Sequence, residues 1–230
     1  MKFLTKYIGT EFFKQARERT VTQVVGELSA AITGGSRLAG GTFEDWSAYV
    51  LSTYGISGTM TVLSKNGVST VAQLDLAPCD TIRYFMDAAH LATLVQRHGA
   101  SAMYLPVAAT SPLVDAWCVC TITCDGSSPE LVVAGCQMTV APSSHPIAGE
   151  DEAKAQFQAI RRTLPRAGHK PIVAAVSESP WVLWVLPAQH YRRFPFQHAK
   201  DGEVPGTVWP FRQGKIGVVL SMEGRTPRDV

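Results

Sequence analysis

Cations and aromatic rings are interleaved over residues 190–200, which read His-Tyr-Arg-Arg-Phe-Pro-Phe-Gln-His-Ala-Lys. Cationic side chains neutralise phosphates and aromatic rings stack on bases, so this composition is typical of a surface that holds single-stranded nucleic acid. The two phenylalanines also have a simpler interpretation. Phe194 and Phe196 can alternate inward on a strand while Arg193 faces solvent, and for the rings alone we favour that interpretation.

Charge is distributed unevenly along the chain, although its net charge is only +2. Residues 41–152 contain three Lys or Arg against eleven Asp or Glu, whereas residues 153–200 contain eight against one. Like charges repel one another unless a polyanion offsets them, so we expect the basic stretch to contact nucleic acid. The candidate contacts are Arg161, Arg162, Arg166, His169, Lys170, His190, Tyr191, Arg192, Arg193 and Lys200.

Four of the five cysteines lie close together in the sequence, at Cys118, Cys120, Cys124 and Cys136. The Cys-x2-Cys pairs of a zinc site are absent, and on an extended strand residues 118, 120 and 124 point to one face. We therefore expect small buried thiols packed with Ile122, and neither metal nor cofactor, with zinc binding and redox chemistry as the alternatives. An odd number of cysteines, and the lack of a secretory or membrane-spanning apolar segment, predict a cytoplasmic protein that does not contact membrane.

Catalytic constellations are hard to find in this chain. There is no Gly-x-Ser-x-Gly, no His-Glu-x-x-His, and the glycine-rich segment 33–42 lacks the Lys-Ser/Thr ending of a phosphate-binding loop. His190 with Tyr191 or Lys200 can serve as acid and base in a metal-independent ribonuclease. We expect a binding protein rather than an enzyme, and keep the ribonuclease as an alternative.

The order of the expected helices and strands predicts an α+β fold with mixed or antiparallel sheets and about three helices. The helices are expected over residues 10–19, with the pattern continuing to Leu28, over 81–98, and from Glu150 to about 164. The strands are expected over residues 49–51, 58–63, 70–76, 103–109, 117–124, 131–140, 171–177, 181–186, 207–211 and 216–221. Asn66-Gly67 predicts a tight hairpin, and residues 125–129 predict a turn.

The charge change also suggests how the chain is divided. We expect an N-terminal α+β region over 1–150 and a basic C-terminal region of one helix and several strands over 151–230. The two can also form one compact unit.

Two parts of the sequence carry a family resemblance. One comprises Pro171-Ile-Val-Ala-Ala-Val-Ser-Glu-Ser179, Leu183 and Pro187-Ala-Gln-His-Tyr-Arg-Arg-Phe194, and the other is Thr42-Phe-Glu-Asp-Trp46. They resemble the small large-subunit-like protein of type IV CRISPR effector complexes, and the resemblance extends over about a third of the chain. Many members of that family carry Cys-x2-Cys zinc-finger pairs around the Phe-x-Asp-Trp element. This chain has no cysteine before Cys79, so the resemblance implies a finger that has been lost or replaced.

The resemblance implies a non-catalytic subunit of an antiviral ribonucleoprotein. Such a subunit holds the 5′ end of the guide RNA, contacts target DNA beside the protospacer-adjacent motif, and binds other subunits of the complex. Arg161, Arg162, Lys170, Arg192 and Arg193 are then the phosphate contacts. Two alternatives stay open: a metal-independent CRISPR RNA-processing endonuclease, and a phage or plasmid structural protein whose acidic region binds a basic partner.

Overall fold

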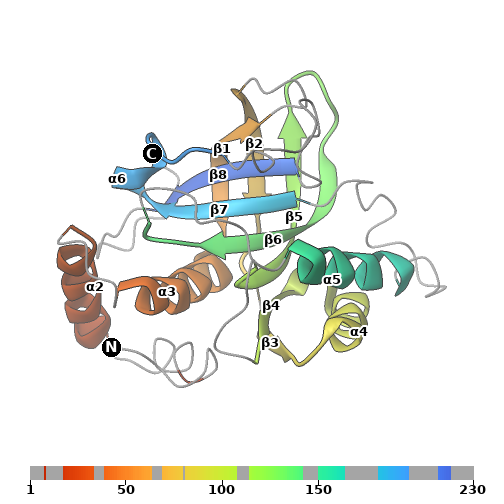
Figure 1. The fold of residues 1–230 in the computed structure, drawn as a ribbon, viewed down its shortest axis with the longest axis horizontal. Coiled ribbons are helices and arrows are strands. Elements are labelled where there is room, and N and C mark those ends of the chain that lie inside the picture. Colours follow the sequence, from red (N-terminus) through yellow and green to blue (C-terminus); the bar gives the residue numbers. More distant parts are fainter. Residues whose placement is uncertain are drawn as a thin grey trace.

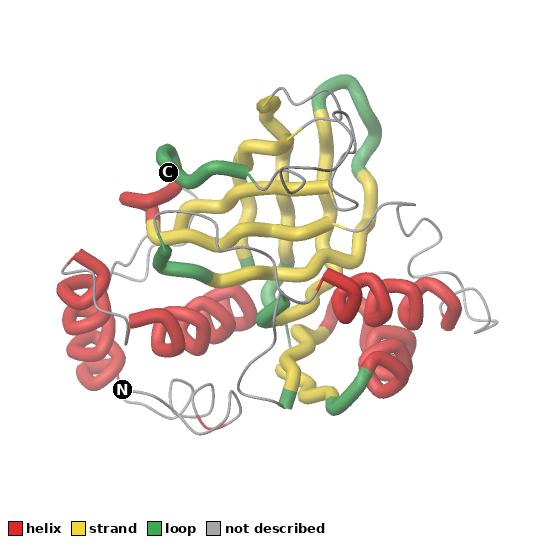
Figure 2. Tube along the Cα trace, in the orientation of Figure 1, coloured by secondary structure: helices red, strands yellow, loops and turns green. Residues whose placement is uncertain are grey.

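The computed structural model describes residues 8, 18–33, 39–63, 69–79, 81–107, 114–141, 150–163, 181–196 and 212–218. Within these ranges lie five α-helices and eight strands, and all eight strands belong to one mixed sheet. Figure 2 shows the strands in yellow, with most of the helices gathered below them. The mixture of helices and strands agrees in outline with the predicted α+β class, but the sequence predicted only about three helices and did not predict a single sheet that closes into a barrel.

Six of the strands close into a barrel. They are β1 (Ile56–Leu63), β2 (Ser69–Leu76), β5 (Ala116–Cys124), β6 (Glu130–Met138), β7 (Trp181–Pro187) and β8 (Arg212–Val218). Their order is β2-β1-β8-β7-β6-β5, and β2 also pairs with β5, which closes the ring. Strands from both of the regions expected from the sequence, 1–150 and 151–230, therefore lie in the same barrel (Figure 1).

The pairing is partly antiparallel and partly parallel. Strands β1 and β2 form the predicted antiparallel pair, in register from Ile56↔Leu76 to Leu63↔Ser69. The turn predicted at Asn66-Gly67 lies outside the described residues. Strands β5 and β6 are antiparallel, and the predicted turn between them contains Gly126 with a φ of 72°, which favours glycine. Strands β6, β7 and β8 run parallel.

The barrel interior forms the first hydrophobic core. On β2, Ala72, Leu74 and Leu76 are buried while the residues between them are exposed, as the two-residue period of a strand requires. Helix α3 (Ala39–Tyr54) lies beneath the barrel in Figure 1, and its Phe43 and Trp46 belong to the same core. Helix α2 (Glu18–Thr33) contacts α3.

A second core covers the outside of the barrel wall. Strand β7 has all seven residues buried, because Trp181, Leu183 and Val185 face the first core while Val182, Trp184 and Leu186 face the second. This confirms the prediction of a strand buried on both faces over 181–186. Helices α4 (Ala88–His98) and α5 (Glu150–Thr163) pack against each other over this second core.

The predicted helix over 81–98 is wrong in its first part. Residues Thr81–Phe85 form strand β3, parallel to β4 (Ala102–Pro106), and α4 begins only at Ala88. Two features explain the difference. The β-branched and aromatic residues of 81–85 suit a strand beside the fully buried β4, and the carboxylate of Asp87 accepts a hydrogen bond from His90 N, which starts the helix there.

Two further boundaries differ from the prediction. Residues 49–51, predicted as a strand, lie in α3, because Phe43, Trp46 and Leu51 recur on one face of a helix. Strand β8 covers Arg212–Val218, so it begins earlier than the strand predicted over 216–221, and residues 219–221 lie outside the described residues. The helix predicted from Glu150 is confirmed, and the strands predicted over 103–109, 117–124 and 131–140 are confirmed with shifted ends. The strands predicted over 171–177 and 207–211, and most of the helix predicted over 10–19, lie outside the described residues.

Candidate nucleic-acid interface

The centre of the basic and aromatic stretch is a short helix and the turn that follows it. Helix α6 (Ala188–Tyr191) begins directly after β7, and Figure 1 shows it at the upper left of the barrel. The backbone N–H groups of Arg193 and Phe194 both donate to the carbonyl oxygen of His190, at 3.1 and 3.0 Å. These bonds fix the turn that carries Arg192 and Arg193.

In this turn the cationic side chains face solvent and the aromatic rings face the core. Arg192 and Arg193 are exposed, and within the part of the chain that the structure describes neither is paired with a carboxylate. Phe194 and Phe196 are buried, and the Phe194 ring lies 5.2 Å from the ring of Trp184. The prediction that both phenylalanines point inward is confirmed, but they lie in an irregular segment rather than on a strand.

A buried lysine lies beneath the same turn. Lys215 of β8 is only 8% exposed, and its Nζ donates to the carbonyl oxygen of Phe194 at 2.8 Å. The ammonium group also lies 4.6 Å from the ring centre of Phe196 and 5.7 Å from that of Tyr191. Burial lowers the pKa of Lys215, because desolvation disfavours its charged form. Sequence reasoning missed this residue, since a lone lysine in an apolar strand gives no signal of its partners.

Tyr191 connects α6 to the barrel rather than offering its hydroxyl to solvent. Its hydroxyl oxygen accepts a hydrogen bond from Thr61 N at 3.1 Å and lies 2.7 Å from Thr61 Oγ1. The neighbouring His190 is half-buried, and its Nδ1 has no hydrogen-bond partner among the described residues. The hydroxyl of Tyr191 is thus engaged, which does not favour it as an acid or base beside His190.

The other residues predicted to contact nucleic acid lie away from the α6 turn or outside the described residues. Arg161 and Arg162 are exposed in the last turn of α5, where cations also offset the helix dipole. Figure 1 shows α5 at the lower right, on the opposite side of the barrel from α6. The described arginines among the predicted contacts, Arg161 and Arg162 on α5 and Arg192 and Arg193 after α6, therefore form two separate groups. Arg166, His169, Lys170 and Lys200 lie outside the described residues.

A third group of cations lies near α5 and was missed at the sequence level. Arg83 of β3 and Arg97 of α4 are exposed, and both are close enough to His98 to affect its ionisation. Burial, and then the two guanidinium charges, lower the pKa of His98. These residues belong to the stretch 41–152, whose acidic net charge concealed a local basic cluster.

Comparisons with protein-family models, with curated proteins and with solved structures found no match.

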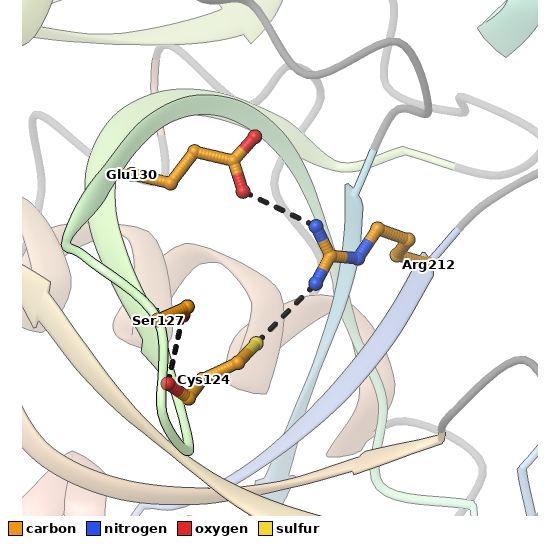
Figure 3. Close-up of polar contacts among 4 residues, drawn as sticks. All are labelled: Cys124, Ser127, Glu130 and Arg212. Carbon is orange, nitrogen blue, oxygen red and sulfur yellow. Dashed lines mark hydrogen bonds and ion pairs between the residues drawn. The ribbon is translucent and has the colours of Figure 1, made fainter.

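One arginine is fully engaged at an end of the barrel (Figure 3). The Nη1 of Arg212 donates to Glu130 Oε2 at 3.2 Å, its Nη2 to Cys124 Sγ at 3.3 Å, and the guanidinium lies 4.1 Å from the ring centre of Trp181. These contacts join the first residues of β6, β7 and β8 to the last residue of β5. Arg212 therefore joins the ends of four strands, and the carboxylate of Glu130 offsets its charge.

The cysteines are placed as the strand pattern predicted. Cys118, Cys120 and Cys136 are buried in the barrel core with Ile122, and Cys124 is half-buried beside it. Across the residues that the structure describes, no group of three or more His, Cys, Asp or Glu side chains is arranged to hold a metal ion. Nor is any helix in these ranges long and apolar enough to cross a membrane.

Proposed function

We propose that this protein is a nucleic-acid-binding subunit of a larger ribonucleoprotein, without catalytic activity of its own. In this proposal Arg192 and Arg193 contact the sugar–phosphate backbone. The observation that carries the proposal is the pair of adjacent, exposed guanidinium groups on a turn that Phe194 and Phe196, both buried in the second core, hold in place. Guanidinium groups bind phosphates with paired N–H donors, and two in succession match a repeating phosphate backbone.

The anchoring of the turn supports this role. The ammonium group of Lys215 donates a hydrogen bond to the carbonyl oxygen of Phe194. At the other end of the segment, the hydroxyl oxygen of Tyr191 accepts a hydrogen bond from Thr61 N of β1. A contact costs less conformational entropy when the backbone that carries the cation is already fixed. The turn is thus better prepared for a polyanion than two arginines on a free loop.

Arg161 and Arg162 are proposed as a second contact. They lie on α5, on the opposite side of the barrel from α6 (Figure 1). A nucleic acid that reaches both sides of the barrel would contact both groups, whereas a shorter one would contact the α6 turn alone.

The narrower role that the family resemblance implies belongs to the same proposal. The bound strand would be the 5′ end of a guide RNA, with target DNA beside the protospacer-adjacent motif as a second ligand. The protein would act inside a type IV effector complex in the cytoplasm, in antiviral defence. The segment Pro187–Phe194 of that resemblance contains both Arg192 and Arg193.

The test is a salt titration of RNA binding. The Arg192→Gln, Arg193→Gln double variant should bind a 5′-labelled single-stranded RNA at least about tenfold more weakly at low salt, with the slope of log affinity against log salt smaller by about 1.4. Fluorescence anisotropy measures both quantities. A purely structural role for the turn would leave the slope unchanged.

Arg83→Gln with Arg97→Gln is the matched control, because it removes two exposed arginines from another part of the surface. We expect its slope of log affinity against log salt to stay closer to that of the unmodified protein than the slope of the Arg192, Arg193 variant does. Unchanged affinity and slope in the Arg192, Arg193 variant would contradict the proposal. Discrete RNA fragments formed in a chelator by the unmodified protein would instead favour the metal-independent endonuclease.

A further inference from the structure

Three residues that contact the α6 turn lie in one row on the outside of the barrel. The register places Thr61 of β1 opposite Lys215 of β8, and it pairs Lys215 with Trp184 of β7. Val62 and Ile216 belong to the core inside the barrel. Because successive residues of a strand point to opposite faces, their neighbours Thr61 and Lys215 point outward. Trp184 belongs to the second core, outside the barrel wall. We call Thr61, Lys215 and Trp184 the anchoring row.

Each member of the anchoring row contacts a different part of the turn. The hydroxyl oxygen of Tyr191 accepts a hydrogen bond from Thr61 N at 3.1 Å and lies 2.7 Å from Thr61 Oγ1. The ammonium group of Lys215 donates to the carbonyl oxygen of Phe194 at 2.8 Å. The ring of Trp184 lies 5.2 Å from that of Phe194. The row therefore holds the chain at residue 191 and again at residue 194.

Arg192 and Arg193 lie between these two fixed points, and both are exposed. The hydrogen bonds from Arg193 N and Phe194 N to His190 O close the same turn. A backbone that is fixed at both ends has already lost conformational entropy, so its side chains bind a ligand at a lower entropic cost. The anchoring row can thus raise the affinity for a ligand that it does not touch.

Lys215 is the member of the row whose residue type is hardest to explain by packing. It is 8% exposed in a central strand, where a methionine of similar length would fill the same space without a buried charge. Its ammonium group bonds the backbone of the turn at Phe194 and lies 4.6 Å from the ring centre of Phe196. The polar end of this lysine is therefore directed to the turn.

We propose, on the basis of the proposed function, that Lys215 is a positioning residue for nucleic-acid binding. Through the anchoring row it holds the turn in the conformation that presents Arg192 and Arg193 to phosphates, and it does not contact the strand itself. Coupling between two parts of a protein is reciprocal. A strand bound at the turn therefore stabilises the contacts of the anchoring row in return.

RNA binding by a Lys215→Met variant tests the positioning role. Fluorescence anisotropy with the labelled single-stranded RNA should show binding at least about fivefold weaker at fixed salt. The slope of log affinity against log salt should stay unchanged, because the number of phosphate contacts is the same. In the Arg192→Gln, Arg193→Gln background the same substitution should change affinity by less than about twofold, because residues that act through one another are not additive.

Hydrogen exchange followed by NMR tests the reciprocal effect. The amides of Arg193 and Phe194 should exchange faster in Lys215→Met than in the unmodified protein. Added RNA should slow exchange of the Thr61 amide, which bonds to Tyr191. Tyr191→Phe removes the hydroxyl held by Thr61 and is the second variant, for which we expect the same pattern of weaker binding and unchanged slope.

Asp87→Ala is the control, because it removes the cap of α4 without touching the anchoring row. It should leave RNA affinity unchanged, which separates positioning from a general loss of stability. Normal affinity in both Lys215→Met and Tyr191→Phe, or an equal loss from Lys215→Met when the two arginines are absent, would overturn the inference. The proposed function fails instead if the Arg192, Arg193 variant binds RNA as the unmodified protein does, and the inference then fails with it.

Discussion

Lys215 is the residue whose position is most unusual for its type. Lysine is almost never buried unless its charge is compensated, and among the described residues its ammonium group contacts a carbonyl oxygen and two aromatic rings rather than a carboxylate. The hydrogen bond to Phe194 O offsets part of the desolvation cost. What the barrel gains is a connection between β8 and the turn that carries Arg192 and Arg193.

This burial predicts a specific dependence of stability on pH. The pKa of Lys215 is lowered in the folded protein, so between that folded pKa and the unfolded value near 10.5 the unfolded chain binds more protons. The contribution of Lys215 to the free energy of unfolding therefore rises with pH in this window, as the cost of burying its charge is relieved. Lys215→Met, which has a similar length and no charge, should lack that rise.

Urea unfolding at a series of pH values up to 10.5 measures the effect as a difference between the two proteins. The difference is needed because other groups titrate in the same range: burial raises the pKa of Tyr104, and contact with Cys118 and burial raise that of Cys136. Both are present in the two proteins and cancel. Parallel stability curves would show that Lys215 does not titrate differently on folding.

At the scale of elements, the sequence predicted best where pattern and tertiary contacts agree. Strands β5, β6 and β7 were found because alternating or continuous apolar residues and a clear turn mark them. Residues 81–85 were misassigned because Ile82, Phe85 and Ala89 also fit a helical period. Only pairing with β4, about twenty residues further along, decides for a strand. A pattern taken from a short stretch of sequence does not include that pairing.

The candidate site was predictable in the same partial way. Sequence composition located Arg192 and Arg193 and favoured inward positions for Phe194 and Phe196. It missed Lys215 and Thr61, which come from strands far away in the chain and meet the turn only once the barrel has closed. It also grouped Arg161 and Arg162 with the α6 turn, because nearness in sequence does not show that a barrel lies between two elements.

Helix α4 offers a test of how its boundary is set. Asp87 caps the helix through a 2.8 Å hydrogen bond from His90 N. Asp87→Ala removes the acceptor and should lower the free energy of unfolding by about 1 kcal/mol. Asp87→Asn is the matched control, because an asparagine oxygen caps a helix about as well, and it should be close to the unmodified protein in urea unfolding. Equal stability of the alanine and asparagine variants would show that this cap does not set the start of α4.

For the whole molecule, closure of the barrel is the step that joins distant parts of the chain. Strands β7 and β8 follow α5 in sequence but lie between β6 and β1 in the sheet, and β2 completes the ring on β5. The turn with Arg192 and Arg193 and the buried Lys215 therefore both depend on the same closed sheet. Loss of packing anywhere inside the barrel should weaken both together.

Leu74 of β2 tests this cooperativity where the ring closes. Its side chain is 2% exposed in the barrel core, and its backbone pairs with Gly58 of β1 and Ile122 of β5. Leu74→Ala should lower the free energy of unfolding by about 2–5 kcal/mol. Val71→Ala on the same strand, at a residue that is 51% exposed, should change it by less than about 0.5 kcal/mol. Hydrogen exchange should show that Leu74→Ala reduces protection in β7 and β8 as much as in β1 and β2. Protection lost only near β2 would mean that the barrel is not one cooperative unit.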